Sequence, residues 1–176
     1  MAGASMKDIK LRIKSVESTM QITKAMELVA SSKLRRAKER VEQSRPYFTI
    51  LMDTLSDIVR ENTEFSSPYT QRRDVKRSCY IVIGGDRGLA GGYNSNIFKA
   101  AMEHMGDKDV VVLPIGKKTV EFFERKGKEL LTRDYAVAAD TSVSDCYAMA
   151  DLLTKKYILE EFDEIYVCYT VFVSML

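Results

Sequence analysis

The feature that most constrains this chain is an apolar repeat through its first third. From Ile9 to Ile58, apolar residues recur at alternating steps of four and three, and only Thr23, Glu27 and Ser44 interrupt them. A spacing of 3.5 residues held over about seven heptads predicts a coiled-coil seam, because a globular helix carries a broader apolar stripe. At 1.5 Å per residue the segment makes a rod of about 75 Å, too long for one compact domain to cover.

The seam therefore needs a second helix, from this chain or from another. We expect one helix from about residue 4 to about residue 60. Pro46 removes one backbone donor and should bend this helix near Glu42. Between Thr23 and Ala30 the seam is small or polar, so that packing is weaker there or the partner differs. The apolar seam residues that we expect to face the partner helix are Ile9, Ile13, Val16, Met20, Leu34, Val41, Phe48, Leu51, Leu55 and Ile58.

The first third is also the basic part of the chain. Residues 1–60 hold 12 Lys and Arg against 7 Asp and Glu, a balance of +5, whereas residues 61–176 hold 15 against 18, a balance of −3. The block KLRRAKER, residues 33–40, is a candidate for a basic region that binds nucleic acid beside a coiled coil. However, Leu34 belongs to the seam and Glu39 dilutes the charge, which favours a solvated helix face. A basic face inside an acidic collar of other subunits is a third interpretation.

After a linker over residues 61–74, residues 75–176 predict an α/β domain, so that residues 1–60 form a separate shaft. Apolar runs alternate with segments of helical character, which favours a doubly wound parallel sheet with right-handed crossovers, that is, a Rossmann-like domain. Ser142 or Ser144 should cap the last helix, with Asp145 in its first turn. The predicted strands are 75–85, 109–116, 129–137 and 163–173, and the predicted helices are 95–105, 117–127 and 142–161.

The stretch IVIGGDRGLAGGYNSN, residues 81–96, lies where an α/β protein would cradle a phosphate. Its glycines do not have the G-x-G-x-x-G spacing, and no lysine follows them as in a P-loop. Asp86 would also repel a phosphate. A nucleotide-binding module stays an alternative, but the glycines also provide a loop without bulky side chains, which a second backbone can approach closely.

Few residues offer catalytic or metal chemistry. His104 is the only histidine and has no cysteine or carboxylate cluster near it, so we expect no catalytic residues, no metal site and no bound cofactor. The three cysteines are isolated in apolar segments, which favours buried thiols over disulfides. No apolar run reaches the roughly 18 residues of a membrane span, and the first residues lack the apolar core of a signal peptide. We therefore expect a protein that is made and kept in the cytosol.

Two long motifs carry a resemblance to a known family. The segment MKDIKLRIKSVESTMQITKAMELVASSKLRRAKER, followed by SRPY, resembles the N-terminal helix of the gamma subunits of F-type ATP synthases, of the bacterial type. The loop IGGDRGLAGGYNSNI is similar to that family's S/T-x-D-R-G-L-C-G-G-x-N segment, with Ala90 where many relatives have Cys. The segments DVKRSCYIVI and YTVFVSML also fit, so the resemblance covers essentially the whole chain. It implies a further C-terminal helix, paired with the first, which this sequence does not contain.

The resemblance implies a non-catalytic rotor subunit. In this family the two terminal helices form an antiparallel coiled coil inside a ring of alpha and beta subunits, and the α/β domain lies outside that ring, beside the membrane rotor of c subunits. Ion flow turns the axle and drives the catalytic beta subunits through different conformations. The implied complex also contains an epsilon subunit, binds no nucleic acid and lies at the cytoplasmic face of the cell membrane. It translocates protons, although the sequence itself does not decide between protons and sodium ions.

The resemblance also assigns contact residues to both parts of the chain. The helix residues expected against loops of the beta subunits are Gln21, Ile22, Thr23, Lys24 and Met26. The loop residues expected near acidic lever segments of the beta subunits are Asp86, Arg87, Leu89, Ala90 and Gly91. Arg87 would be the charge partner, because a guanidinium can bind a carboxylate with two hydrogen bonds. The alternative is that Asp86 and Arg87 pair with each other and only hold the loop in shape.

Overall fold

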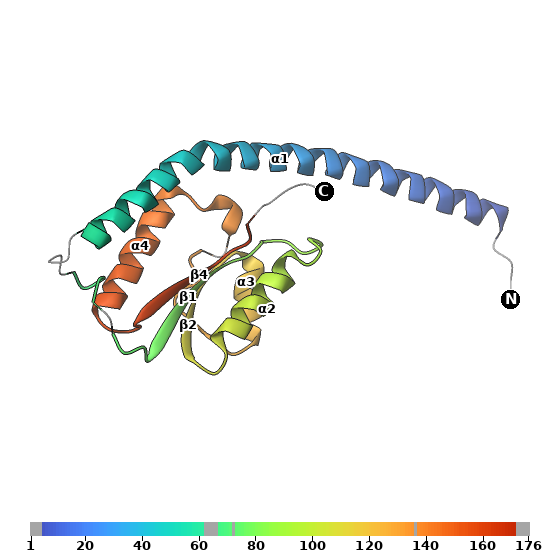
Figure 1. The fold of residues 1–176 in the computed structure, drawn as a ribbon. Coiled ribbons are helices and arrows are strands. Elements are labelled where there is room, and N and C mark those ends of the chain that lie inside the picture. Colours follow the sequence, from blue (N-terminus) through green and yellow to red (C-terminus); the bar gives the residue numbers. More distant parts are fainter. Residues whose placement is uncertain (1–4, 62–66, 72, 136, 172–176) are drawn as a thin grey trace. The chain divides into compact units, whose positions relative to one another are not determined.

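The computed structural model of the chain describes residues 5–61, 67–71, 73–135 and 137–171 (Figure 1). The chain divides into two compact units, Met1–Ser66 and Ser67–Leu176, and each is described here by itself. Residues 62–66 and 72 of the predicted linker lie outside the described residues, so the domain limits expected from the sequence stay predictions.

The first unit consists of one helix. α1 (Met6–Glu61) is 56 residues long and unbroken, which confirms the long helix expected from the apolar repeat (Figure 1). At its start, the side chains of Ser5 and Asp8 accept hydrogen bonds from backbone N–H groups. Ser5 Oγ accepts from the Lys7 N–H at 3.3 Å, and Asp8 Oδ2 accepts from the Ser5 N–H at 3.2 Å. None of the residues of α1 is buried.

Pro46 lies inside α1 and does not end it. Because proline has no N–H, it cannot donate the helical hydrogen bond to the carbonyl of Glu42, one turn earlier. Figure 1 shows the axis of α1 changing direction in its C-terminal half, which contains Pro46. The helix thus accommodates the proline by bending.

The second unit is built on a parallel sheet of four strands in the order β3-β2-β1-β4. The strands are β1 (Arg77–Ile83), β2 (Asp109–Ile115), β3 (Glu129–Leu130) and β4 (Glu164–Cys168). Tyr80 in β1 lies beside Val112 of β2 and Tyr166 of β4, in the middle of the sheet. The chain passes outward from β1 to β3 and then crosses back to the other side of β1, which is the doubly wound topology.

Helices cover both faces of this sheet (Figure 1). The helices are α2 (Tyr93–Met105), α3 (Lys117–Arg125) and α4 (Val143–Ile158). One core packs α2 and α3 on Tyr80, Val82, Val110 and Val112, and the other packs α4 on Cys79, Val111, Leu113 and Ile115. Successive residues of a strand point to opposite faces, so β1 and β2 are buried on both sides and read as continuous apolar runs. The predicted α/β, Rossmann-like fold is confirmed.

The start of α4 follows the local signal in the sequence. The Asp145 N–H donates to Ser142 Oγ at 3.2 Å, and the Ser142 N–H donates to Asp145 Oδ2 at 2.7 Å. This reciprocal pair is a capping box, and it confirms Ser142, not Ser144, as the cap of the helix.

All four strands are shorter than the sequence predicts, β1 and β2 only at their ends and β3 and β4 by more. β3 has two residues where 129–137 was expected, because Thr132 Oγ1 donates to Asp134 Oδ2 at 2.6 Å and turns the chain away; residue 136 lies outside the described residues. β4 ends at Cys168 where a strand to residue 173 was expected. Cys168 lies opposite Val82, one residue before β1 ends, so no ladder continues there; residues 172–173 lie outside the described residues.

Candidate subunit-contact surfaces

The glycine loop, residues 84–92, connects β1 to α2 at the carboxyl edge of the sheet. Asp86 fastens this loop to two other segments. Asp86 Oδ1 accepts hydrogen bonds from the backbone N–H groups of Lys117 at 3.2 Å and Ala138 at 2.8 Å, and Oδ2 accepts one from Ala139 at 3.0 Å. One carboxylate thereby joins the loop to the first residue of α3 and to η1 (Ala138–Asp140), a short 3-10 helix before α4.

These hydrogen bonds determine the charge of Asp86. Burial is the largest single influence and raises the pKa of Asp86, but the N–H donors of Ala138, Ala139 and Lys117, together with the Lys117 ammonium, outweigh it. The pKa of Asp86 is lowered from its ordinary value of 3.8, so the carboxyl is an anion at neutral pH. The loop is therefore held through backbone donors, and not through the Asp86–Arg87 pair considered as the alternative above.

Asn94, in the first turn of α2, holds the other side of the loop. Its Oδ1 accepts from the Gly85 N–H at 2.8 Å, and its Nδ2 donates to the Arg87 carbonyl at 3.2 Å. The side chain thus bridges the beginning and the middle of the loop. Asn94 was not among the residues expected from the sequence, because an asparagine in a turn has no distinctive spacing to its partners.

Two backbone N–H groups that a phosphate could use in this class of fold bind side chains of the chain itself. Phosphates bind backbone N–H groups at helix N-termini and in glycine loops. Here the Lys117 N–H, at the start of α3, binds Asp86, and the Gly85 N–H binds Asn94. At the start of α2, the Tyr93 N–H donates to the Ala90 carbonyl at 3.2 Å, and no described side chain caps the helix. The geometry therefore favours a structural use of this loop.

Two glycines are required where β1 and β2 end. A Cβ added to Gly84 would lie 2.3 Å from Thr119 Oγ1, and one added to Gly116 would lie 2.5 Å from the Gly84 carbonyl oxygen. Gly116 also has a φ of +99°, which L residues rarely adopt. The close backbone approach expected at the glycine loop is thus made, at this end, by Gly116 of the same chain.

The tip of the loop, Gly88 to Gly91, is different. A Cβ added at Gly88 or Gly91 would have no neighbouring atom within 4 Å. Leu89 has a left-handed φ of 58°, and its side chain is fully exposed. Neither the backbone conformation nor the exposure of this leucine stabilises the isolated chain. Both are typical of a residue that contacts another molecule. Arg87 and Ala90 beside it are exposed as well.

The helix residues assigned by resemblance occupy more than one face of α1. Thr23 lies in the seam, and its Oγ1 donates to the Thr19 carbonyl at 2.9 Å. Ile22 and Met26 lie away from the seam, and Val29 continues their face at helical spacing. These three side chains are 57–67% exposed and form a second apolar stripe. Val29 was not predicted as a contact residue, because it lies outside the 3.5-residue repeat. The assigned residues Gln21, Ile22, Thr23, Lys24 and Met26 are all exposed.

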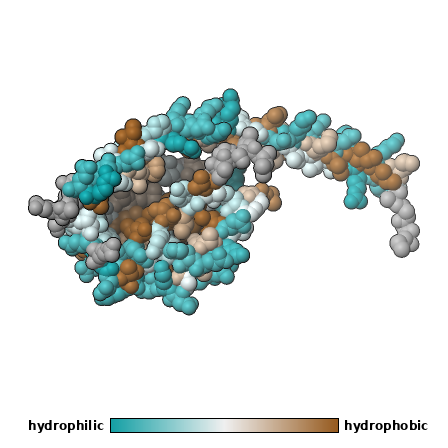
Figure 2. Space-filling view, viewed as in Figure 1, coloured by the Kyte–Doolittle hydropathy of each residue, from teal (hydrophilic) through white to brown (hydrophobic). Residues whose placement is uncertain are grey.

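The seam itself is at the surface. Its ten apolar residues, from Ile9 to Ile58, are 40–64% exposed. Figure 2 shows apolar side chains, in brown, at the surface along α1. Contiguous exposed apolar surface of this length marks a site of protein interaction. Because the seam stays exposed, the helix that it needs as a partner is not among the described residues.

The basic block of α1 is partly neutralised by its own helix. Arg35 lies 4.0 Å from Glu39, and Lys38 lies 3.6 Å from Glu42, each one turn apart. Both pairs are solvent-exposed, so they contribute little to stability. They do reduce the charge that a nucleic-acid backbone would meet, which favours the solvated face over the basic-region interpretation.

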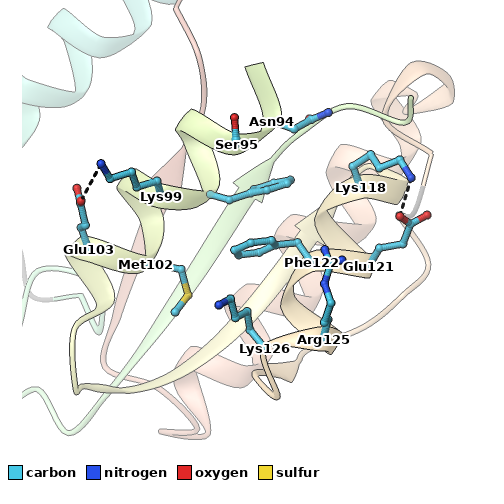
Figure 3. Close-up of a pocket in the computed structure, with 11 residues that line it drawn as sticks. Asn94, Ser95, Lys99, Met102, Glu103, Lys118, Glu121, Phe122, Arg125 and Lys126 are labelled. Atoms are coloured by element: carbon cyan, nitrogen blue, oxygen red, sulfur yellow. Dashed lines mark hydrogen bonds and ion pairs between the residues drawn. The ribbon is translucent and has the colours of Figure 1, made fainter. Parts of the chain in front are cut away.

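A groove of about 530 Å³ between α2 and α3 is a further surface that the sequence did not indicate. Its floor is apolar: the rings of Phe98 and Phe122 stack with centroids 4.6 Å apart (Figure 3). On the rim, Lys118 pairs with Glu121 at 2.6 Å, and Lys99 pairs with Glu103 at 3.8 Å. Arg125 and Lys126 also line the groove, so these two pairs leave its rim with a positive charge, and no described group marks it as the site of a particular ligand.

The histidine and cysteines have structural surroundings. His104 Nδ1 lies 2.8 Å from the Tyr80 hydroxyl, and burial raises the pKa of Cys79 to about 12. Cys168 is half-buried, but Cys146 is exposed, so the expectation of three buried thiols is wrong for Cys146, which lies on the solvent face of α4. Within the described ranges, no cluster of three or more His, Cys, Asp or Glu side chains could hold a metal. No helix in that part of the chain is both long and apolar enough to span a membrane.

Comparison with known proteins assigns the family. The model of a family described as ATP synthase matches residues 5–176. The chain is 46% identical over 173 residues to the ATP synthase gamma chain of Alkaliphilus metalliredigens and 43% identical over 178 residues to that of Ruminococcus albus. It is 39% identical over 171 residues to a protein of Acetobacterium woodii named "ATP synthase gamma chain, sodium ion specific".

These alignments cover 97–98% of this chain but only 57–62% of the relatives. The chain thus spans about three fifths of the length of the curated relatives it matches. The order of elements, a long N-terminal helix followed by an α/β unit with the D-R-G-L-A-G-G loop after β1, agrees with the resemblance seen in the sequence. The chain belongs to the ATP synthase gamma chain family.

Proposed function

We propose that this chain is the central rotor subunit of an ATP synthase, and that it transmits torque between a membrane ring of c subunits and a ring of alpha and beta subunits. The observation that carries the proposal is α1, a 56-residue helix with no buried residue. Its seam and its second stripe, Ile22, Met26 and Val29, lie on different faces. One partner helix covers only one face of a rod, so the second stripe needs another protein. An axle inside a ring has this requirement.

The glycine loop is the second part of the proposal. Leu89, Ala90 and Gly91 form the contact with an acidic lever segment of the beta subunit, and Arg87 is the charge partner. The exposed leucine and the open space at Gly91 support this contact. An exposed ion pair contributes about 0–1 kcal/mol. Such a weak contact suits a rotor, which must not bind one angular position too strongly.

In this proposal catalysis belongs to the beta subunits, and the chain binds no nucleotide itself. The support is the internal use of the backbone N–H groups at Gly85 and Lys117, which a phosphate would otherwise need. Titration with ATP and with NAD should therefore give no saturable binding to the chain. Saturable binding with an intact fold would favour the alternative of a nucleotide-binding module. Salt-dependent binding to duplex DNA would favour the nucleic-acid alternative in the same way.

The setting of the proposal is the cytoplasmic face of the cell membrane. The chain reaches the membrane only through the complex, with the c ring and the epsilon subunit as further partners. The coupling ion is left to experiment, because the similar proteins include one named as sodium ion specific. Comparing ATP-driven acidification with ATP-driven sodium uptake in membrane vesicles distinguishes the two ions. Our sequence-based expectation is proton transport.

The test uses a disulfide in the assembled complex. Ala90→Cys is combined with a cysteine in the beta lever segment, in a Cys146→Ser background that removes the exposed native thiol. Oxidation should crosslink the two subunits and stop ATP turnover, and a reductant should restore it. The absence of a crosslink in every nucleotide state would refute the contact.

The matched control is Asp107→Cys. Asp107 is exposed and lies just before β2, so it is at the opposite edge of the sheet from the glycine loop. It should not crosslink to the same beta cysteine. A crosslink there of equal yield would mean that the assay reports random collisions.

A further inference from the structure

We infer that Asp86 is a positioning residue, whose carboxylate fastens the glycine loop to two other segments and so holds its tip, Gly88 to Gly91, for contact with a second protein. The inference rests on the proposed function in one respect, namely that the tip is a contact. It goes beyond that function because it separates the residue that touches the partner from the residue that holds the loop in place. The observation behind it is one carboxylate with three backbone donors from two distant segments.

The two segments belong to opposite faces of the sheet. Lys117 opens α3, which packs through Phe123 into the core shared with α2. Ala138 opens η1 and itself packs against the other core, which contains Met149 of α4. Asp86 therefore connects the loop to both layers of the α/β unit at once. A force applied at the tip is passed to the two cores.

The loop needs such a fastening because of its composition. Five of the nine residues from 84 to 92 are glycine, which has the largest backbone freedom of any residue. A carboxylate that accepts N–H donors forms stronger hydrogen bonds than a neutral acceptor, and a negative charge is favoured at the N-terminus of α3. Asp86 and Asn94 together hold the loop on both sides of Arg87. The tip itself is held only by the Tyr93 N–H, which donates to the Ala90 carbonyl at 3.2 Å, and this is where the partner would bind.

The same geometry removes Asp86 from the contact surface. Oδ1 accepts two hydrogen bonds and Oδ2 accepts one, so most of the acceptor capacity of the carboxylate is used inside the chain. The side chain is also half-buried, whereas Arg87 and Leu89 are exposed. We therefore assign the contact to Arg87 and Leu89 and the fastening to Asp86.

The first readout is amide hydrogen exchange on the full-length gamma chain in its assembled complex. Asp86→Ala should speed exchange at the N–H groups of Lys117, Ala138 and Ala139 by on the order of tenfold, because each loses a charged acceptor. Asp86→Asn keeps a neutral acceptor and should give a smaller increase, and it serves if the alanine variant does not fold. The control Asp107→Asn, at an exposed turn, should change none of the three. Unchanged exchange at all three in both Asp86 variants would overturn the inference.

The second readout is the rate of the disulfide between Ala90→Cys and the beta lever segment. Adding Asp86→Ala should slow this crosslink several-fold while the melting temperature of the complex stays within a few degrees. Asp86→Glu, which restores the carboxylate, should recover part of the rate. A crosslink at the original rate despite faster amide exchange would show that Asp86 does not position the tip. Failure of Ala90→Cys to crosslink in the otherwise unaltered complex would instead refute the contact and leave the exchange result to decide on the fastening.

Discussion

At the scale of single residues, the carboxyl edge of the sheet uses its glycines in two ways. Gly84 and Gly116 are needed because β1, β2 and α3 meet there with no room for a side chain. Gly88 has open space around it and is needed for nothing within the chain. The difference separates the part of the loop that maintains the fold from the part available to a partner.

Gly116→Ala should destabilise the α/β unit, and Gly88→Ala should not. The new methyl group at position 116 would lie 2.5 Å from a carbonyl oxygen, on a backbone with φ of +99°. We expect the free energy of unfolding to fall by about 1–3 kcal/mol or more for Gly116→Ala, and to change by less than about 0.5 kcal/mol for Gly88→Ala. Urea unfolding measures both. Equal effects would contradict the distinction.

Asp163 gives the α/β unit a dependence on pH. Its Oδ2 accepts from the N–H groups of Lys76 at 2.8 Å and Arg77 at 3.0 Å. The hydrogen bonds from Arg77 and Lys76 are the main causes that lower the pKa of Asp163 from 3.8. Because the pKa is lower in the folded state, the stabilisation is fully present above the unfolded pKa and is lost as pH falls through the folded one.

Asp163→Asn should therefore lower stability at neutral pH and flatten its fall below about pH 4. The exposed Asp107→Asn serves as the control and should preserve the slope. Urea midpoints measured from pH 7 down to about pH 2.5 distinguish the two variants. If the wild type and Asp163→Asn had the same slope throughout, Asp163 would not be a source of the pH dependence.

The role of Asp86 could not be predicted from the sequence, for a physical reason. Its partners lie 31 and 52 residues further along the chain, and they are backbone N–H groups, which leave no mark on residue type. The sequence did predict Asp86 beside a glycine-rich turn and suggested either a contact or a pair with Arg87. Only the fold, which brings α3 and η1 to the end of β1, shows which groups the carboxylate binds.

At the scale of elements, prediction succeeded where one period covered the whole element. The 3.5-residue repeat predicted α1, and the buried apolar runs predicted β1 and β2, because burial on both faces leaves a continuous signal. The length of β3 was predicted wrongly, because the strand ends at a turn formed by Thr132 and Asp134. The apolar pattern of the sequence does not report this turn.

Leu34→Asp tests the seam of α1. Leu34 lies in the seam and is 41% exposed in this chain, so the substitution should scarcely alter the isolated chain. Where a partner helix covers the seam, an unpaired buried charge costs about 3–5 kcal/mol, so assembly should fail or weaken strongly. Lys38→Ala, which removes only the exposed pair with Glu42, should assemble normally. Co-purification with the other subunits measures both variants, and full assembly of Leu34→Asp would disprove the seam.

At the scale of the whole molecule, the chain offers two separate contact surfaces, one on each unit. The stripe of Ile22, Met26 and Val29 lies on α1, and the loop tip lies on the α/β unit. The rotor function proposed above needs both kinds of contact, because a bearing guides rotation whereas a lever contact transmits force. The two surfaces should therefore respond differently to mutation.

Met26→Lys should impair coupling more than hydrolysis. A charge in the bearing stripe disturbs the fit between rotor and ring, while the catalytic residues of the beta subunits are untouched. We expect ATP-driven ion pumping in vesicles to fall several-fold more than ATP hydrolysis. Ile50→Lys is the matched control, since both side chains are 67% exposed and Ile50 lies outside the expected ring contact. Equal losses of pumping and hydrolysis in Met26→Lys would argue against a role in coupling.

The exposure of α1 has a consequence for how the cell sets the amount of this protein. A helix about 84 Å long that buries none of its residues gains little from the residues described here, so its stability must come from whatever covers it: a partner helix on the seam and other subunits on the second stripe. A copy made in excess would therefore present the uncovered stripe of Ile22, Met26 and Val29 to proteases and chaperones. Degradation of such orphans would match the number of surviving chains to the number of rings, without any dedicated regulator. Pulse-chase labelling with and without co-expressed alpha and beta subunits would reveal this as a difference in half-life.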